Sequence, residues 1–308
     1  MRCNGSALIL TMHNPHASES ARNHSPFASG DVVIFYDRRR RRYSVPLSTG
    51  GSYSSHLGAI NHDDIIGRTE GFIAVTSKGH RVTALRPTFQ ESIFNLPRQS
   101  QVIYPKDLGA LLIRLDLYPG ANVVEGGLGS GAASAAILRA IGPTGLLTTY
   151  EVRGEIIEKS QANISQLTPE STNHKIVLAD IYESGIAERG IDRILFDLPE
   201  PWRAVEHAAT ALRTGGIIAV FLPTVLQVHK LSLAFTSDPR WRLIETTEMI
   251  ERPWHVTEMS VRPEHRMVAH TGFITTARRC ELFGDNEPEA DETHQALQLD
   301  ADIEPSAE

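Results

Sequence analysis

The sequence has little cysteine and no long apolar run, and each shortage excludes a class of protein. Its 308 residues include two cysteines, Cys3 and Cys280, which predict neither a disulfide framework nor a metal site. No apolar stretch approaches the roughly 20 residues of a membrane-spanning helix, so we expect no membrane association. Residues 7–10 are too short an apolar run for a signal peptide. With an apolar fraction of 41%, the chain is typical of a globular protein in a reducing, cytoplasmic compartment.

Basic residues are missing from the end of the chain, and this makes the net charge of −7 misleading. After Arg279 there are ten Asp or Glu and no Lys or Arg, so residues 1–279 hold 30 basic against 27 acidic residues. A slightly basic body can bind nucleic acid through local patches, although its net charge does not require it. Residues 1–25 and the acidic residues 281–308 lack apolar periodicity, which predicts disorder at both ends.

Residues 26–95 contain short β-like segments separated by turn residues, which predict a small all-β domain, a barrel or a sandwich. Five consecutive arginines, Arg38 to Arg42, separate two of these segments and should form a hairpin tip. Two interpretations stay open for them: a solvated charged turn, or a patch that contacts phosphates. The expected strands are residues 32–36, 43–45, 71–76 and 81–85.

Residues 96–280 alternate between strand-like and helix-like segments. Residues 86–103 are expected to be a connector, and Tyr104-Pro105 opens a helix over residues 108–115. The alternation predicts an α/β domain with a Rossmann-like, mostly parallel sheet and helices on both faces. The expected strands are residues 122–125, 147–151, 175–179, 191–196 and 216–222, then 241–247 and 270–277; the expected helices between them are residues 130–141, 155–167, 203–212 and 225–235.

The first strand of this domain runs into a glycine-rich turn, Glu-Gly-Gly-Leu-Gly-Ser-Gly at residues 125–131. A dinucleotide-binding G-x-G-x-x-G needs a third glycine that is out of place here, and a P-loop needs a Gly-Lys-Ser/Thr that is absent. The pattern fits best the E-x-G-x-G-S-G turn of S-adenosylmethionine-dependent methyltransferases. A tight strand–helix connection without a ligand remains the alternative.

Acidic residues stand at the ends of the next three strands, where ligands of α/β sheets bind. Glu151, at the end of the second strand, can accept hydrogen bonds from both hydroxyls of a ribose. Asp180, after the third strand, can accept a hydrogen bond from the amino group of an adenine. Each acid alone is more typical of a helix N-cap or a surface loop. The third acid, Asp197, begins the distinctive stretch Asp-Leu-Pro-Glu-Pro-Trp after the fourth strand. Three acids together with the glycine turn favour a nucleoside ligand.

These stretches together resemble the tRNA adenine-58 N1-methyltransferases, and the bacterial homotetrameric type most of all. The resemblance extends from about residue 30 to residue 279. Its order and spacing are far more specific than any single motif. The stretches that carry it are residues 101–107 (Gln-Val-Ile-Tyr-Pro-Lys-Asp), 125–131, 150–153 (Tyr-Glu-Val-Arg), 197–202 and 262–273.

The resemblance implies a class I methyltransferase domain behind a small N-terminal β domain, assembled as a homotetramer. It implies transfer of methyl from S-adenosylmethionine to N1 of adenine 58 in the T-loop of tRNA. N1 of neutral adenine carries a lone pair, so no base has to remove a proton first. Asp197 would accept a hydrogen bond from the N6 amino group and stabilise the positive charge that develops on the ring. The implied cofactor-binding residues are Gly127, Leu128, Gly129, Ser130, Gly131, Glu151, Arg153, Asp180 and Ile181; the implied substrate-binding residues are Tyr104, Asp197 and Phe221, with Asp197 catalytic.

Some residues depart from this pattern or stay ambiguous. Phe221 stands where some members have a tyrosine near the target base, so one hydrogen bond would be lost and a stacking surface kept. Trp202 is interpreted as core packing or as a stacking residue. Two other functions remain open: a methyltransferase for a different substrate, and a non-catalytic tRNA-binding subunit, which would lose the glycine turn and the aspartate that this chain retains.

Overall fold

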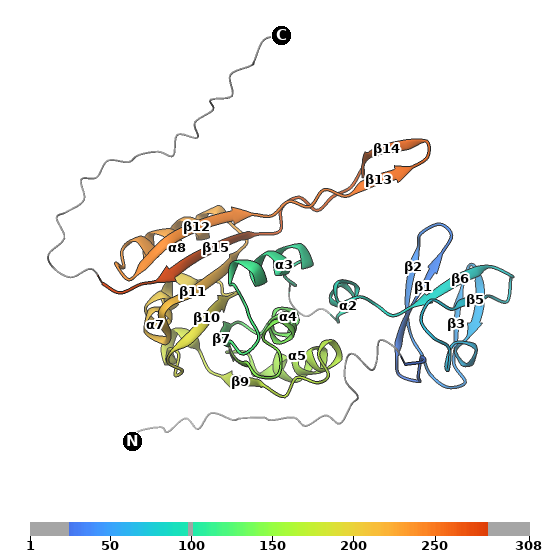
Figure 1. Ribbon diagram of the computed structural model, residues 1–308, viewed down its shortest axis with the longest axis horizontal. Helices are drawn as coiled ribbons and strands as arrows, with labels where there is room; N and C mark the ends of the chain where they lie inside the picture. The colour runs from blue at the N-terminus through green and yellow to red at the C-terminus, as the bar shows by residue number, and fades with distance from the viewer. Residues whose placement is uncertain (1–24, 98–100, 283–308) are drawn as a thin grey trace, which may run out of the picture.

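The computed structural model describes residues 25–97 and 101–282 (Figure 1). The predicted disorder of residues 1–25 and 281–308 lies outside them except at residues 25, 281 and 282. The first part of the described chain is all-β. A four-stranded antiparallel sheet in the order β2-β1-β6-β5 and a two-stranded sheet, β3-β4, share one buried core. The elements are β1 (Val32–Asp37), β2 (Arg42–Pro46), β3 (Ser52–Ser55), β4 (Gly58–Asn61), a 3-10 turn (His62–Asp64), β5 (Ile73–Val75) and β6 (Arg81–Leu85).

Burial of the central strand β1 explains why this unit folds. Val33 and Phe35 are fully buried, and Phe35 pairs with Tyr43 of β2 on one side and Ala84 of β6 on the other. Val33 and Phe35 join the core shared with β3-β4, and Ile34 between them is buried too, so β1 is covered on both faces. The predicted all-β character is confirmed.

The predicted connector before the α/β domain is wrong in one respect, because it contains the helix α2 (Phe89–Asn95). Thr88 accepts a hydrogen bond from the Glu91 amide at 3.2 Å, and the Glu91 carboxylate accepts one from the Thr88 amide at 2.9 Å. This reciprocal capping box satisfies two amides that the first turn of a helix leaves without partners. Ile93 anchors the helix in the core.

The second part is built on a seven-stranded sheet in the order β12-β15-β11-β10-β7-β8-β9. All neighbours are parallel except β15, which lies antiparallel between β11 and β12. The strands are β7 (Asn122–Gly126), β8 (Leu146–Glu151), β9 (His174–Leu178), β10 (Ile191–Phe196), β11 (Leu212–Leu222), β12 (Trp241–Glu248) and β15 (Phe273–Arg279); the helices are α3 (Pro105–Arg114), α4 (Ala132–Ile141), α5 (Gly154–Leu167), α6 (Ile181–Ser184), a 3-10 turn (Pro201–Ala204), α7 (Val205–Ala211) and α8 (Val225–Thr236).

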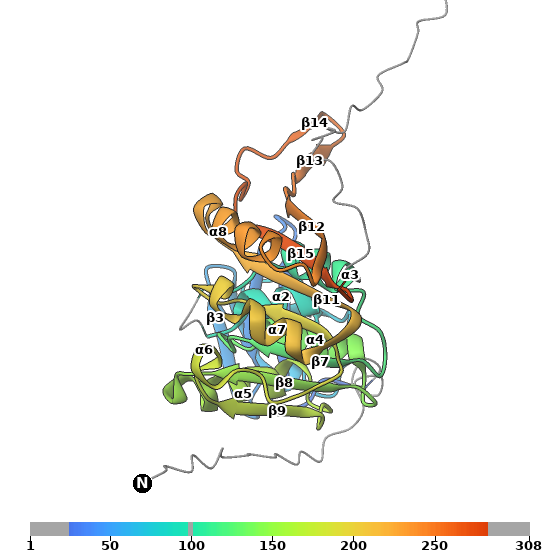
Figure 2. The same cartoon turned by 90° about the vertical axis from the view of Figure 1, so that its left-hand side faces the viewer.

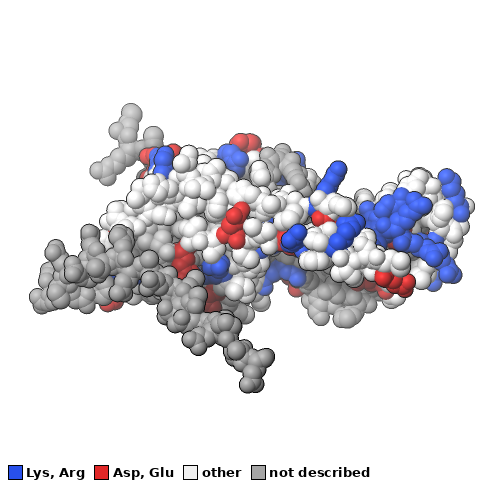
Figure 3. Space-filling model, turned by 90° about the horizontal axis from the view of Figure 1, so that it is seen from above, with Lys and Arg blue, Asp and Glu red and all other residues white. Residues whose placement is uncertain are grey.

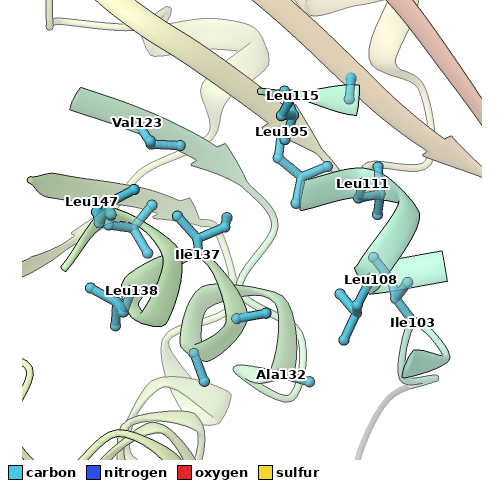
Figure 4. Close-up of a cluster of buried hydrophobic side chains, with 14 of the residues drawn as sticks. Ile103, Leu108, Leu111, Leu115, Val123, Ala132, Ile137, Leu138, Leu147 and Leu195 are labelled. Carbon is cyan, nitrogen blue, oxygen red and sulfur yellow. The ribbon is translucent and has the colours of Figure 1, made fainter. Parts of the chain in front are cut away.

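Helices cover both faces of this sheet, as predicted. Val123 of β7 packs into one core with α3, α4 and α5, whereas its neighbour Val124 packs into the other core with α7 and α8. Figure 4 shows the first of these cores, with Leu108 and Leu111 of α3 beside Ile137 of α4. The crossovers therefore change sides between β7 and β10. In an open α/β sheet, this point of reversal is where ligands bind.

The sequence analysis missed a β-hairpin, β13 (Trp254–Thr257) and β14 (Ser260–Pro263), inserted between β12 and β15. Figures 1 and 2 show it projecting away from the sheet. We call residues 249–271, which include this hairpin, the arm. Apolar side chains on the arm face solvent, including Val256, Val261 and Met259, the last 94% exposed. Among the described helices, none has the length and apolar character to cross a bilayer.

Candidate active site

Backbone hydrogen bonds bring three of the predicted strand ends together. The Gly127 amide donates to the Tyr150 carbonyl of β8, and the Asp197 amide donates to the Gly126 carbonyl of β7, both at 2.9 Å. The glycine turn, residues 127–131, therefore lies directly between Glu151 and Asp197. This is the reversal point of the sheet, so the structure places these predicted site residues where a ligand is expected.

Two glycines of the turn are required by what surrounds them. Gly127 has φ +93°, and a β-carbon there would overlap the carbonyl oxygen of Asp197. Gly131 has φ +83°, and its β-carbon would lie 2.6 Å from the Ile164 side chain of α5. Left-handed backbone combined with such close approach admits only glycine. The turn is thereby held against both the fourth strand end and α5.

Glu151 is nearly surrounded by donors. Its carboxylate accepts hydrogen bonds from the Leu128 amide at 3.1 Å and from the backbone and guanidinium of Arg153 at 2.9 and 3.0 Å. Burial opposes its ionisation, but the bonds from Arg153 and Leu128 outweigh it, so the pKa of Glu151 is lowered. Glu151 is thus a fixed negative charge at the end of β8.

Asp197 differs from Glu151 because its carboxylate has no donor among the described residues and its pKa is raised. Asp197 as a residue reaches solvent at the end of β10, although the surrounding protein still desolvates its carboxylate, and no described residue donates a hydrogen bond to that carboxylate. Close packing of protein around it raises the pKa of Asp197 to about 6, with Arg153 opposing the rise and Glu151 adding to it. At neutral pH it is an anion that attracts Arg153 but accepts no hydrogen bond from a described residue, which suits a residue that pairs with a ligand.

A third carboxyl group, Glu125, was assigned no role of its own by the sequence analysis. It is fully buried at the end of β7, where Oε2 accepts hydrogen bonds from Ser134 at 2.5 Å and Thr149 at 2.7 Å, while Oε1 has no partner among the described residues. Burial raises the pKa of Glu125 to about 8, and the nearby charges of Asp197 and Glu151 add to the rise. The only available signal was its place immediately before the glycine turn.

Glu125, Glu151 and Asp197 form a carboxyl cluster around the turn, and Arg153 is the cation that interacts with it. Like charges at close range need a counter-charge to stay ionised. Glu125 is mostly protonated at neutral pH, so Glu151 and Asp197 carry the charge. Arg153 offsets one of them, so the cluster stays negative and fits a cationic ligand such as an adenosyl sulfonium. Within residues 25–97 and 101–282 no group of three or more His, Cys, Asp or Glu side chains is arranged to hold a metal ion.

The remaining predicted cofactor residues lie around the same turn. Leu128 and Ser130 are buried, and Gly129 and Ser130 carbonyls accept hydrogen bonds from α5. Asp180 caps α6, with Oδ1 accepting from the Tyr182 amide at 2.9 Å, and Ile181 is buried behind it. Asp180 therefore performs the N-cap role that the sequence left as an alternative, and its contact with an adenine stays a prediction.

Tyr104 stands at the start of α3, and its ring meets Phe94 of α2 edge-on with centroids 5.8 Å apart. The two rings border a pocket of about 200 Å³. Phe94 was missed because the helix that carries it was predicted as a connector. A larger cavity of about 540 Å³ lies between the β unit (β1 to β6) and α5, but none of the predicted site residues lines it.

Phe221 and Trp202 are placed differently from one another. Phe221 is only 7% exposed and packs under Gly272, where a β-carbon would lie 2.4 Å from its ring. Trp202 is partly buried, and the Lys230 ammonium lies 5.1 Å from its ring centroid. The contact of Phe221 with a substrate stays a prediction, and both interpretations of Trp202 remain.

Two of the stretches that carry the family resemblance meet beside Tyr104. Lys106 Nζ donates to Asp107 at 2.8 Å and to the Thr271 hydroxyl at 2.5 Å, and Thr271 donates to Asp107 at 2.6 Å. Lys106 also binds the Met249 carbonyl. Because Met249 and Thr271 are the two ends of the arm, this buried network ties the root of the arm to the helix that begins at Tyr104.

The strand order, the glycine turn after β7 and the carboxyl groups on the following strands together define a class I S-adenosylmethionine-dependent methyltransferase fold. Comparison with known proteins narrows this class. A family model described as "tRNA methyltransferase complex GCD14 subunit" matches residues 81–279, and one described as "TrmI-like N-terminal" matches residues 26–74. The chain belongs to the tRNA (adenine-58-N1)-methyltransferase family.

Individual relatives agree with this assignment. The tRNA (adenine(58)-N(1))-methyltransferase TrmI of Thermus thermophilus is 32% identical over 247 residues, which cover 80% of this chain and 96% of that protein. The structure of tRNA (m1A58) methyltransferase TrmI from Aquifex aeolicus has a TM-score of 0.74 at 27% identity and covers 83% of this chain and 99% of the other. A structure described as an S-adenosylmethionine-dependent O-methyltransferase from Thermotoga maritima has a TM-score of 0.81 at 29% identity, covering 89% and 100%.

Proposed function

We propose that this protein transfers a methyl group from S-adenosylmethionine to N1 of adenine 58 in tRNA, with Asp197 as the catalytic residue. The observation that supports it most is the Asp197 carboxylate. It is accessible, lacks a donor among the described residues, and lies against the glycine turn. A base with an amino group beside its reacting nitrogen supplies the missing donor.

The residues at the reversal point fit the cofactor. The carboxyl cluster suits its positive charge, and the glycine turn offers bare backbone at the start of α4. Glu151 would accept hydrogen bonds from the ribose hydroxyls, and Asp180 would accept one from the adenine amino group. Leu128, Ile181 and Arg153 would enclose the nucleoside. When bound, S-adenosylmethionine supplies an electrophilic methyl group on a sulfonium.

The chain's own contribution is then positioning and charge. Asp197 would accept a hydrogen bond from N6 of the target adenine, which orients N1 toward the methyl group. Its negative charge would stabilise the adenine as it becomes cationic, and such preorganised groups typically contribute about 10²–10³ in rate. Phe94 and Tyr104 would offer a stacking surface that offsets part of the few kcal/mol needed to extrude a stacked base.

We also propose a homotetramer in which the arm contacts a neighbouring subunit. Contiguous apolar side chains on a projecting hairpin are unfavourable in water and mark an interaction site. Val256 and Val261 face each other across the hairpin and are 54% and 69% exposed. Because the proposed substrate is tRNA, we place the activity in the cytoplasm.

The arm can be tested without disturbing the hairpin. A Val256→Glu, Val261→Lys double variant keeps a favourable cross-strand pair but removes the apolar surface. We expect light scattering to give a smaller assembly for this variant. Val75→Glu on β5, where the valine is 59% exposed, is the matched control and should leave the mass unchanged. An unchanged mass for the arm variant would contradict the proposed role of the arm.

The activity is tested with the full chain, unmodified tRNA transcript and methyl-labelled S-adenosylmethionine, with the product mapped by mass spectrometry and primer extension. We expect 1-methyladenosine at position 58, and none in a transcript with guanosine there. Asp197→Ala should lower kcat by about 10² or more, whereas Glu200→Gln in the same loop should not. Cofactor binding measured by calorimetry with no label in tRNA would retain the fold and reject the substrate.

A further inference from the structure

The hairpin tip between β1 and β2 displays arginines in a fixed arrangement. Asp37 is almost fully buried, and its Oδ1 accepts hydrogen bonds from the Arg39 and Arg41 amides at 2.8 and 2.9 Å. Arg41 returns its guanidinium to the same carboxylate at 2.6 Å. One aspartate thus fixes the backbone of the turn, and the following residue, Arg42, pairs with Glu91.

Three guanidiniums remain without a partner. Arg38, Arg39 and Arg40 are all exposed, and no described carboxylate lies within ion-pair distance of them. Neighbouring like charges repel one another, so this arrangement is unfavourable in the free protein.

Arg40 adds a second observation. Its φ is +61°, in the left-handed region that glycine or asparagine adopts most readily and that a long side chain disfavours. Backbone strain that is kept at an exposed position points to a role for the side chain. The chain therefore retains an arginine where the local conformation favours glycine.

The surroundings extend the positive surface. The tip lies on the side of the molecule toward which the arm projects (Figure 1). Figure 3 looks down on that side and shows Lys and Arg side chains gathered at the end of the molecule that holds the β unit. Guanidiniums bind phosphate oxygens through paired N–H groups, and a polyanion would relieve their mutual repulsion.

We propose that Arg38, Arg39 and Arg40 dock the phosphate backbone of the tRNA, at a site separate from the methyl-transfer centre. This rests on the proposed function for the identity of the RNA. The turn contributes to affinity and orientation only, because phosphate contacts position a nucleic acid and carry no sequence information. It takes no part in the chemical step.

The test compares three variants of the full chain: R38Q/R39Q/R40Q, R38K/R39K/R40K and R40G. Neutralising the three should raise the KM for tRNA roughly tenfold or more, with kcat at saturating tRNA and cofactor affinity unchanged. The slope of log K against log salt should fall by about one for each lost phosphate contact. The lysine variant should keep most of the slope. R40G should weaken tRNA binding while its melting temperature stays the same or rises, which separates binding from folding.

An unchanged KM and salt slope in the glutamine variant would overturn the proposal, and so would a loss confined to kcat. Direct binding of tRNA, measured by fluorescence anisotropy, keeps the test independent of catalysis. If the unaltered protein binds tRNA with a salt slope that the glutamine variant loses, yet no methyl group is transferred, the docking site stands and the proposed function fails.

Discussion

Two of the tight turns with left-handed backbone differ in what surrounds them. The glycine turn at residues 127–131 is enclosed by neighbouring strands and by α5, so that a β-carbon at Gly127 would overlap the carbonyl oxygen of Asp197. The arginine turn at residues 38–41 stands in solvent, and its left-handed residue is Arg40. Steric exclusion decides the residue type in the first turn, whereas in the second a charged side chain is kept against the local preference.

The charges around the two turns differ in the same way. Around the glycine turn, Glu125 and Asp197 are carboxyl groups whose pKa values are raised by enclosure in protein. Around the arginine turn, exposed guanidiniums repel each other in high dielectric, where each pair costs little. We therefore expect substitutions in the glycine turn to lower stability strongly, and substitutions in the arginine turn to affect stability little.

The largest effect is expected at Gly127. Gly127→Ala should destabilise the fold by about 2 kcal/mol or more, because it combines left-handed strain with a collision against backbone that cannot move aside. Activity should fall at least about 100-fold as the turn separates from Asp197. The matched control is Gly190→Ala, since Gly190 has φ +68° with nothing within 4 Å of its β-carbon position. It should cost about 1 kcal/mol and leave activity intact. Equal losses in denaturant unfolding would contradict the packing argument.

Glu125→Gln should remove a pH-dependent penalty. The folded-state pKa of Glu125 is raised to about 8 from an ordinary 4.5, so between these values the native state holds a proton that the unfolded state releases. Stability therefore falls as pH rises from 5 to 8, by up to a few kcal/mol. Relative to the unaltered protein, Glu125→Gln should gain stability across this range in urea unfolding.

Glu188→Gln is the control for this measurement. Although burial opposes its ionisation, hydrogen bonds from Tyr150 and Lys175 lower the pKa of Glu188. Its stabilising contribution is complete above pH 5 and is lost only as pH falls through the lowered value. The deficit of Glu188→Gln should therefore be constant between pH 5.5 and 8. A constant difference for Glu125→Gln as well would show that Glu125 is not protonated in the native state.

The pH profile of activity should report Asp197. With a pKa raised to about 6, its carboxylate is lost below that pH, and kcat/KM should fall about tenfold per unit. Asp197→Asn should lower activity and abolish this acid limb, whereas Glu200→Gln should keep it. An acid limb that persists in the asparagine variant would assign the titration to another group.

The smallest effect is expected at Arg40. Arg40→Gly should leave stability within about 1 kcal/mol of the unaltered chain, on the stabilising side, because glycine accepts φ +61° without strain. Thermal unfolding measures this directly. A clear loss of stability would mean that the guanidinium makes a contact that holds the turn, and the contrast between the two turns would no longer hold.

Much of the fold could be predicted from periodicity. The strands of the central sheet and the helices that follow them were located within a few residues, because apolar runs bounded by turn residues specify buried parallel strands. Helix α2 was missed although Thr88 and Glu91 form the S/T-x-x-E capping pattern in the sequence. The hairpin β13-β14 was missed because each strand has only four residues, too few for the alternation of Trp254 and Val256 with polar neighbours to stand out.

The candidate site, like the fold, could be predicted only in part from the sequence. The sequence by itself determined the glycine turn, the positions of the strands along the chain and the acids at their ends, because glycine and apolar spacing act locally. Only the tertiary structure decided that Glu151 is held by donors while Asp197 is left without one, that burial raises the pKa of Glu125, and that Phe94 meets Tyr104. Hydrogen-bond partners, burial and pKa depend on groups far apart in the chain, and local sequence does not encode which of them meet.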